Sequence, residues 1–147
     1  MAIHRILVPI DFSPDSLHAL TYARDVAQRV GAELLLLCVM EPIYYGAVMD
    51  FSEDLWRTSN AQLDRIATDL KKRGQRVRTR VQRGAPSQVI VDAAKNTGTD
   101  LIVMGTHGRT GLAHMLIGSV AERVVRTAHC PVLTVRRARR KPRSSRK

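Results

Sequence analysis

The chain has 147 residues, the length of one domain, and its 44% hydrophobic content is typical of a soluble globular protein. Its longest apolar run, residues 32–40, is too short to cross a bilayer, and the opening residues lack the regions of a signal peptide, so we expect a cytoplasmic location. The formal net charge is +11, but the last twelve residues hold eight bases and no acid, which leaves 16 basic and 13 acidic residues elsewhere. The excess charge therefore lies in a tail, which we expect to be disordered.

Strand and helix patterns alternate from the first residues onward. A short β-branched apolar run predicts a buried strand at 3–10. Ser13 and Pro14 form a helix start, with serine as the cap and proline at the first helical position, and Gly31 ends the apolar helical spacing that follows. A run of leucines predicts the second strand at 33–40.

The same alternation continues to the end of the chain. An irregular stretch at 41–51, with proline, glycine and two tyrosines, precedes the second half. The expected elements there are a helix at about 52–73, an edge strand at 76–82, a short helix from Pro86, a strand at 101–104, a helix at 118–128 and a strand at 131–135. Alternating strands and helices require parallel pairing, so we predict a single-domain, open, Rossmann-like α/β sheet with helices on both faces.

Two loops of this sheet are candidates for a ligand site, because ligands of such sheets bind beyond the carboxyl ends of the strands. The second of them, GTHGRTGLAHMLIGS, follows the fourth strand. Its backbone N–H groups at Gly105 and Gly108, and the helix start at Gly118 and Ser119, could hold a phosphate. Asp11 in the first loop could accept hydrogen bonds from a ribose.

Two readings without a ligand remain open. The glycines could form only a tight turn between a loop and a helix, and Asp11 could cap the first helix in competition with Ser13. Two standard nucleotide motifs are absent, since the chain contains no GxxxxGK[ST] and has DFSPD, not GxGxxG, after its first strand.

The spacing Gly105-x2-Gly108-x9-Gly118-Ser119, with ILVPIDFS and RGAPSQVIVDAA before it, resembles the ATP-binding class of the universal stress protein family. The resemblance covers roughly residues 1–137, and it implies a five-stranded sheet of order 3-2-1-4-5 and a homodimer through the last strand. We expect a universal stress protein domain at 1–137. The basic tail, 138–147, departs from the family pattern.

The resemblance also implies the residues of a nucleotide site. The first loop would line the base and sugar, Val39 would contact adenine through its backbone, and Met104 would lie beneath the triphosphate. The implied nucleotide-binding residues are Pro9, Ile10, Asp11, Val39, Met104, Gly105, His107, Gly108, Arg109, Gly118, Ser119 and Val120. Mg²⁺ is expected as the partner of the triphosphate.

The function expected from these features is that of a cytoplasmic ATP-binding stress or signalling protein, with slow ATP hydrolysis at most. Hydrolysis would need a general base, and only His107 and Asp11 are candidates, each with another task. One alternative is a module that binds nucleic acid or another anionic surface through the tail. A second is a dimeric scaffold that uses the nucleotide only for stability. Tyr44, Tyr45 and Phe51 are expected to cover the sheet edge rather than the adenine.

Overall fold

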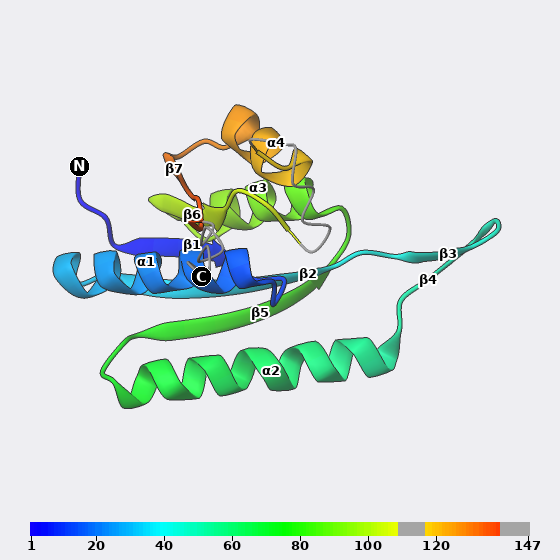
Figure 1. Ribbon diagram of the computed structural model, residues 1–147, viewed down its shortest axis with the longest axis horizontal. Coiled ribbons are helices and arrows are strands. Elements are labelled where there is room, and N and C mark those ends of the chain that lie inside the picture. Colours follow the sequence, from blue (N-terminus) through cyan, green and yellow to red (C-terminus); the bar gives the residue numbers. More distant parts are fainter. Residues whose placement is uncertain (109–116, 139–147) are drawn as a thin grey trace, which may run out of the picture.

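A computed structural model describes residues 1–108 and 117–138, and its main feature is a five-stranded parallel sheet (Figure 1). The strand order is β5-β2-β1-β6-β7, which confirms the predicted order 3-2-1-4-5. The strands are β1 (Arg5–Pro9), β2 (Glu33–Met40), β5 (Val77–Arg83), β6 (Leu101–Gly105) and β7 (Val132–Val135). As expected, the strand with alternating charges, β5, lies at an edge of the sheet.

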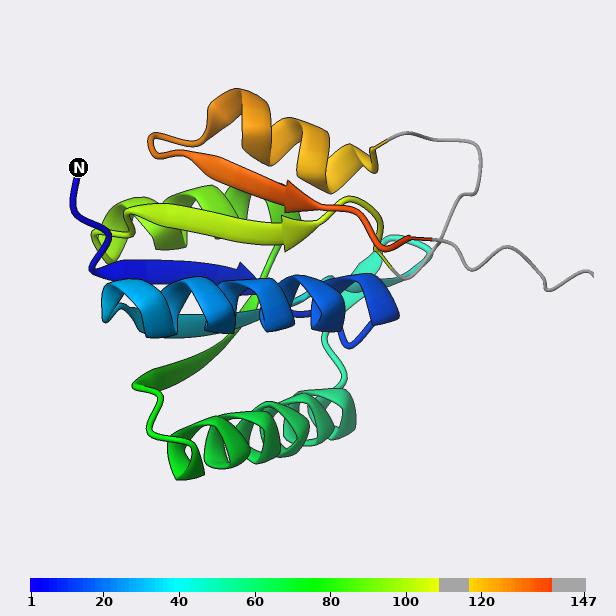
Figure 2. The ribbon, with the colours of Figure 1, turned by 60° about the vertical axis from the view of Figure 1, so that its left-hand side comes forward.

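Two helices cover each face of the sheet (Figure 2). The helices are α1 (Pro14–Val30), α2 (Glu53–Lys72), α3 (Pro86–Asn96) and α4 (Ser119–Thr127). Alternate leucines of β2 point to opposite faces, so Leu34 and Leu36 pack with α1 and α2, while Leu35 and Leu37 pack with α3 and α4. Burial on both faces explains why this strand is a continuous apolar run.

The boundaries of α1 follow from its end residues. The Ser13 hydroxyl accepts a hydrogen bond from the backbone N–H of Ser16 at 3.2 Å, and Pro14 occupies the first turn. Gly31 has a φ of 72°, the left-handed conformation that ends many helices. Both predicted signals are therefore confirmed. Within the described ranges, no helix combines the length and apolar character needed to cross a membrane.

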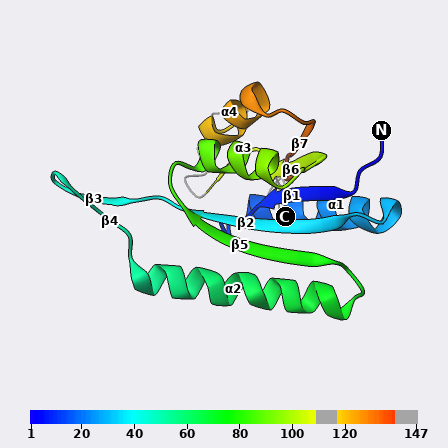
Figure 3. The same ribbon diagram turned by 180° about the vertical axis from the view of Figure 1, so that it is seen from behind.

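The irregular stretch expected at 41–51 is instead mostly a β-hairpin of β3 (Ile43–Tyr45) and β4 (Val48–Asp50), so that prediction is wrong. The strands pair locally across a two-residue turn in which Gly46 has a φ of 63°. The hairpin extends away from the sheet beyond the end of β2 (Figures 1 and 3).

The hairpin also corrects the expected role of its tyrosines. Tyr44 and Tyr45 are 67% and 66% exposed, so neither covers the sheet edge. Phe51, after the hairpin, does lie at that edge, since its ring and that of Trp56 both face the guanidinium of Arg83 in β5. The prediction for the aromatic residues therefore holds only for Phe51.

Candidate functional site

The carboxyl ends of β1, β2 and β6 and the start of α4 surround a crevice of about 390 Å³. Its walls comprise residues 9–11, 37–41, 104–108 and 118–121. Side chains of α2 and α3 complete it, among them Leu55, Ser59 and Ile90. The crevice therefore occupies the position at which open α/β sheets bind ligands.

The residues implied by the sequence converge on this crevice. Eleven of the twelve line it, whereas Arg109 lies outside the described residues. The eleven are Pro9, Ile10, Asp11, Val39, Met104, Gly105, His107, Gly108, Gly118, Ser119 and Val120. Their common placement makes a single site geometrically feasible.

A tight turn after β1 holds Asp11 in the crevice wall. Phe12 has a φ of 61°, a conformation that residues other than glycine seldom adopt. The Asp11 Oδ1 accepts a hydrogen bond from the backbone N–H of Ser13 at 2.9 Å, while Ser13 caps the helix. The Asp11 Oδ2 faces the glycine loop, because a Cβ on Gly108 would lie 3.0 Å from it. Asp11 therefore does not act as the helix cap, and one of its oxygens faces the opposite loop.

The protein's own backbone explains the absence of side chains at two of the glycines. A Cβ on Gly105 would lie 2.9 Å from the carbonyl oxygen of Asp15, and one on Gly118 would lie 3.0 Å from that of Thr106. The first distance is shorter than real contacts of a Cβ and the second is tighter than most of them, so the close packing of loop and helices favours glycine at both positions. The hypothesis that the glycines form a tight turn between a loop and a helix thus explains these two positions. The argument for a ligand therefore depends on the shape and lining of the crevice.

The N-terminus of α4 opens into the crevice. Its N-cap, Gly118, has no side chain to accept the first helical N–H groups, in contrast to the serine caps of α1 and α2. The backbone N–H of Gly118 donates to Thr106 O at 2.6 Å, and the next three residues line the cavity. Helix N-termini carry a partial positive charge and unpaired donors, so this wall suits an anion.

A second, outer cavity of about 550 Å³ adjoins the crevice. The two share Asp11, His107 and Gly108. In the outer cavity, Asp15 Oδ2 lies 3.5 Å from His107 Nδ1, and Asp15 Oδ1 lies 3.4 Å from Arg137 Nε. The His107 ring also contacts the Thr106 hydroxyl at 3.0 Å. The carboxylate of Asp15 thus lies between two groups that can carry positive charge.

Several lining residues were missed by the sequence reasoning. Leu55 and Ser59 lie four positions apart on α2, so their helical spacing could have placed them on one face. Arg137 is the last residue of the expected domain, and nothing in its spacing indicates that it contacts Asp15.

Comparison with known proteins assigns the family. The model of the universal stress protein family matches residues 2–136. Universal stress protein MJ0531 of Methanocaldococcus jannaschii is 35% identical over 142 residues, which cover 92% of this chain and 84% of that protein. The structure of the hypothetical protein MJ0577 of the same organism aligns with a TM-score of 0.82 at 28% identity, over 95% of this chain and 100% of the other.

A universal stress protein solved in complex with cAMP aligns with a TM-score of 0.70 at 28% identity, over 92% of this chain and 98% of the other. The family match covers the part of the chain that forms the five-stranded sheet and the crevice at the ends of its strands. The chain belongs to the universal stress protein family.

Proposed function

We propose that this protein binds ATP in the crevice and acts in stress response or signalling. The observation that carries the proposal is that the N-terminus of α4, whose N-cap is a glycine, and the carboxylate of Asp11 line one cavity at the ends of the strands. A phosphate fits the first group and a ribose the second. The similar protein solved with cAMP supports an adenine nucleotide as the ligand class.

The walls of the crevice suggest an orientation for the nucleotide. Near the end of β2, Leu37, Val39 and Met40 offer an apolar wall for a base. At the other side, Gly118 and Ser119 offer backbone and hydroxyl donors for phosphates. We therefore place adenine at the end of β2 and the phosphates at the start of α4.

Mg²⁺ fits this site as a partner of the phosphates. The Asp11 carboxylate and the Ser119 hydroxyl both line the crevice and offer the oxygen ligands that Mg²⁺ prefers. Among the described residues, no group of three or more His, Cys, Asp or Glu side chains could hold a metal by itself. The ion would thus enter with the nucleotide, and it would neutralise part of the phosphate charge.

The proposed role is binding, with slow hydrolysis at most. His107 contacts Thr106 and Asp15, and Asp11 accepts a hydrogen bond from Ser13, so both candidate bases have structural partners. Efficient hydrolysis needs a base positioned beside an attacking water. A phosphate-release assay in excess Mg-ATP checks this part, and turnover faster than about one per second would contradict it.

We further propose that two copies pair through the edge strand β7 and that the protein is cytoplasmic. Leu133 on that strand is 38% exposed, and an edge strand has backbone groups available for pairing. Sedimentation of wild type and Thr134→Pro tests the pairing, because the backbone groups of Pro131 and Val135 point to β6 and those of Thr134 point away from it, so proline at 134 removes a donor from the free edge. Residues 1–137 would form the domain.

The basic tail, 138–147, supports an accessory function in binding nucleic acid. Such binding would weaken steeply with salt and show no sequence preference. Removal of 138–147 should abolish retention of DNA at low salt and leave ATP binding intact. Equal retention of DNA without the tail would contradict this role.

Titration of the purified protein with Mg-ATP, after mass spectrometry for co-purified nucleotide, tests the main proposal. The test variant is Val39→Trp, which would fill the adenine end of the crevice, and its control is Val125→Trp, on an exposed position of α4 outside the lining. We expect Val39→Trp to lower ATP affinity at least about tenfold, a loss of about 1.4 kcal/mol, and the control to bind normally. Absence of ATP binding by the wild type, or equal binding by Val39→Trp, would overturn the proposal.

A further inference from the structure

The outer cavity is not explained by the adenine, ribose and phosphate positions described above. It begins where the crevice ends, at His107 and Gly108, and the start of α1 and the segment after β7 form its far walls. A phosphate chain that runs past Gly108 would therefore enter it. The cavity is large enough, at about 550 Å³, to hold a phosphate group with its water.

The chain after β7 is attached beside the glycine loop. The backbone N–H of Thr106 donates to Val135 O at 3.2 Å, which fixes the end of β7 next to the residue before His107. Figure 2 shows this segment leaving β7 beside the end of β6. Two residues later, Arg137 reaches Asp15 of α1. The first residues of the basic segment therefore belong to the rim of the site.

Asp15 holds Arg137 by a contact that an anion could replace. The Asp15 side chain is only 19% exposed, and its two oxygens face Arg137 and His107 at 3.4 and 3.5 Å. The Arg137 side chain is 54% exposed, so it has room to move. Guanidinium donors match the geometry of phosphate oxygens and bind them in pairs. A terminal phosphate in the cavity would compete with Asp15 for Arg137.

We propose that the outer cavity is a compartment for the terminal phosphate and that Arg137 binds that phosphate, so that the site prefers nucleoside triphosphates to monophosphates. This inference rests on ATP binding in the crevice. A monophosphate is held at α4 and does not reach Arg137, whereas the third phosphate does. Asp15 keeps Arg137 at the rim before the ligand arrives, and its negative charge also opposes the incoming phosphate.

The proposal makes opposite predictions for the two partners of the ion pair. Arg137→Gln should lower the affinity for Mg-ATP about tenfold and change the affinity for AMP less than twofold. Asp15→Asn should raise the affinity for Mg-ATP several-fold, because the phosphate then meets no competing carboxylate, and leave AMP unchanged. If the pair had a purely structural role, each variant would change the affinities for ATP and AMP equally. The change would also have the same direction in both variants.

The pair Arg24 and Asp25 supplies matched controls, since it is also an ion pair on α1, at 3.1 Å, but lines neither cavity. Arg24→Gln and Asp25→Asn change the net charge equally and should leave both affinities as in the wild type. Calorimetric titration of the full chain measures the four variants, with melting temperatures to confirm that each is folded.

Three outcomes overturn the inference. In the first, Arg137→Gln binds ATP with the affinity of the wild type. In the second, Arg137→Gln loses affinity for ATP and AMP by the same factor. In the third, Arg24→Gln loses as much affinity for ATP as Arg137→Gln does. If the wild type binds AMP and ATP but these variants show no difference between them, only the terminal-phosphate compartment is wrong. If the wild type binds neither nucleotide, the proposed function itself fails.

Discussion

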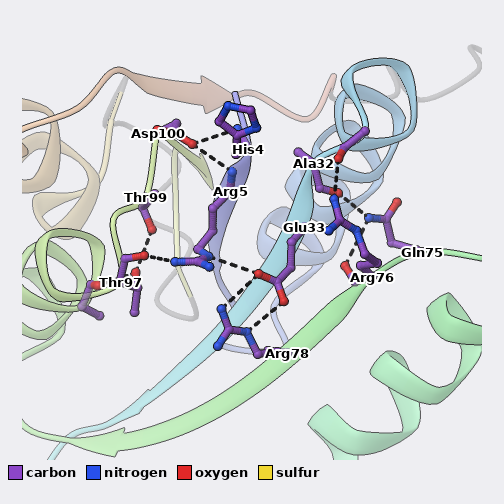
Figure 4. A network of polar contacts seen from close by, with 12 residues as sticks. His4, Arg5, Ala32, Glu33, Gln75, Arg76, Arg78, Thr97, Thr99 and Asp100 are labelled. Atoms are coloured by element: carbon purple, nitrogen blue, oxygen red, sulfur yellow. Dashed lines mark hydrogen bonds and ion pairs between the residues drawn. The ribbon is translucent and has the colours of Figure 1, made fainter. Parts of the chain in front are cut away.

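At the amino ends of the strands, charged side chains bind one another, whereas at the carboxyl ends polar groups line a cavity. Figure 4 shows the amino ends, where the carboxylate of Glu33 forms ion pairs with Arg5 and Arg78. The Nε to carboxylate distances are 3.2 and 2.9 Å. Asp100 accepts the backbone N–H groups of His4 and Arg5 at 2.8 and 3.0 Å. Each charge in this network has partners within the protein.

At the carboxyl ends the arrangement differs. The N-cap of α4 is Gly118, which has no side chain to bond the first helical N–H groups, and Asp11 and Ser119 line the crevice. The polar groups at the two ends of the sheet therefore differ in their surroundings, since those at the amino ends bind one another and those at the carboxyl ends line a cavity that a ligand could enter. Variants at the first end should change stability, and variants at the second should change binding.

The largest expected effect is that of Ser119→Glu. A carboxylate at the first position of α4 suits the helix dipole, so the stability should stay equal or rise by about 0.3–1 kcal/mol. The same charge should lower ATP affinity by about two orders of magnitude, since repulsion between charges about 4 Å apart amounts to about 1–4 kcal/mol. Calorimetry and thermal melting measure the two effects, and Ser119→Gln is the uncharged control. Loss of stability together with binding would break the comparison.

Asp100→Ala should show the reverse behaviour. It removes the acceptor of two backbone N–H groups and should lower the free energy of unfolding by about 1–2 kcal/mol. Asp100→Asn keeps one acceptor oxygen and should lower the free energy of unfolding by less than Asp100→Ala does. Urea denaturation measures the change, and ATP affinity should equal that of the wild type. A tenfold change in affinity would mean that the two ends of the sheet are coupled.

A smaller effect concerns acid stability. Burial acts to raise the pKa of Glu33, but hydrogen bonds and charge from Arg78 and Arg5 outweigh it and hold the pKa below its ordinary value of 4.5. The N–H groups of His4 and Arg5 hold the pKa of Asp100 below its ordinary value of 3.8. Carboxylates with lowered pKa values stabilise the fold above those ordinary values, and their contribution disappears as the pH falls through the folded-state values.

Denaturation of wild type and of the double variant Glu33→Gln/Asp100→Asn, between pH 7 and pH 3, measures this contribution. The difference in free energy of unfolding should be constant from pH 7 to about pH 5.5 and shrink as the pH falls below 4.5 and then 3.8. A difference that grows in acid would have the wrong sign for this network.

Much of the fold could be predicted because its signals are local. The cap at Ser13, the left-handed Gly31 and the leucine run of β2 each depend on a few adjacent residues. The order of the strands came from the family resemblance, since alternation by itself does not determine which strands are neighbours. The hairpin at 43–50 was missed because proline, glycine and tyrosine are common in both loops and tight hairpins.

The position of the site could be predicted from the sequence, but several of the contacts that form it could not. Loop spacing placed the glycines correctly, yet two of them are favoured by the nearby carbonyl oxygens of Asp15 and Thr106, which the sequence does not reveal. Arg137 could not be found either, because its contact with Asp15 joins residues 122 positions apart through the end of β7. Contacts of this kind depend on how the elements meet, and no local pattern records them.

The left-handed Phe12 has a consequence for the thermodynamics of any ligand that meets Asp11. The backbone conformation and the bond from Ser13 restrict this carboxylate in the free protein. An acid that is already oriented loses little conformational entropy when it accepts a hydroxyl group, so that part of the association carries a small entropic cost. Substitution of residue 12 by glycine would relieve the strain and make the loop more mobile. The loop would then lose more conformational entropy when the ligand binds.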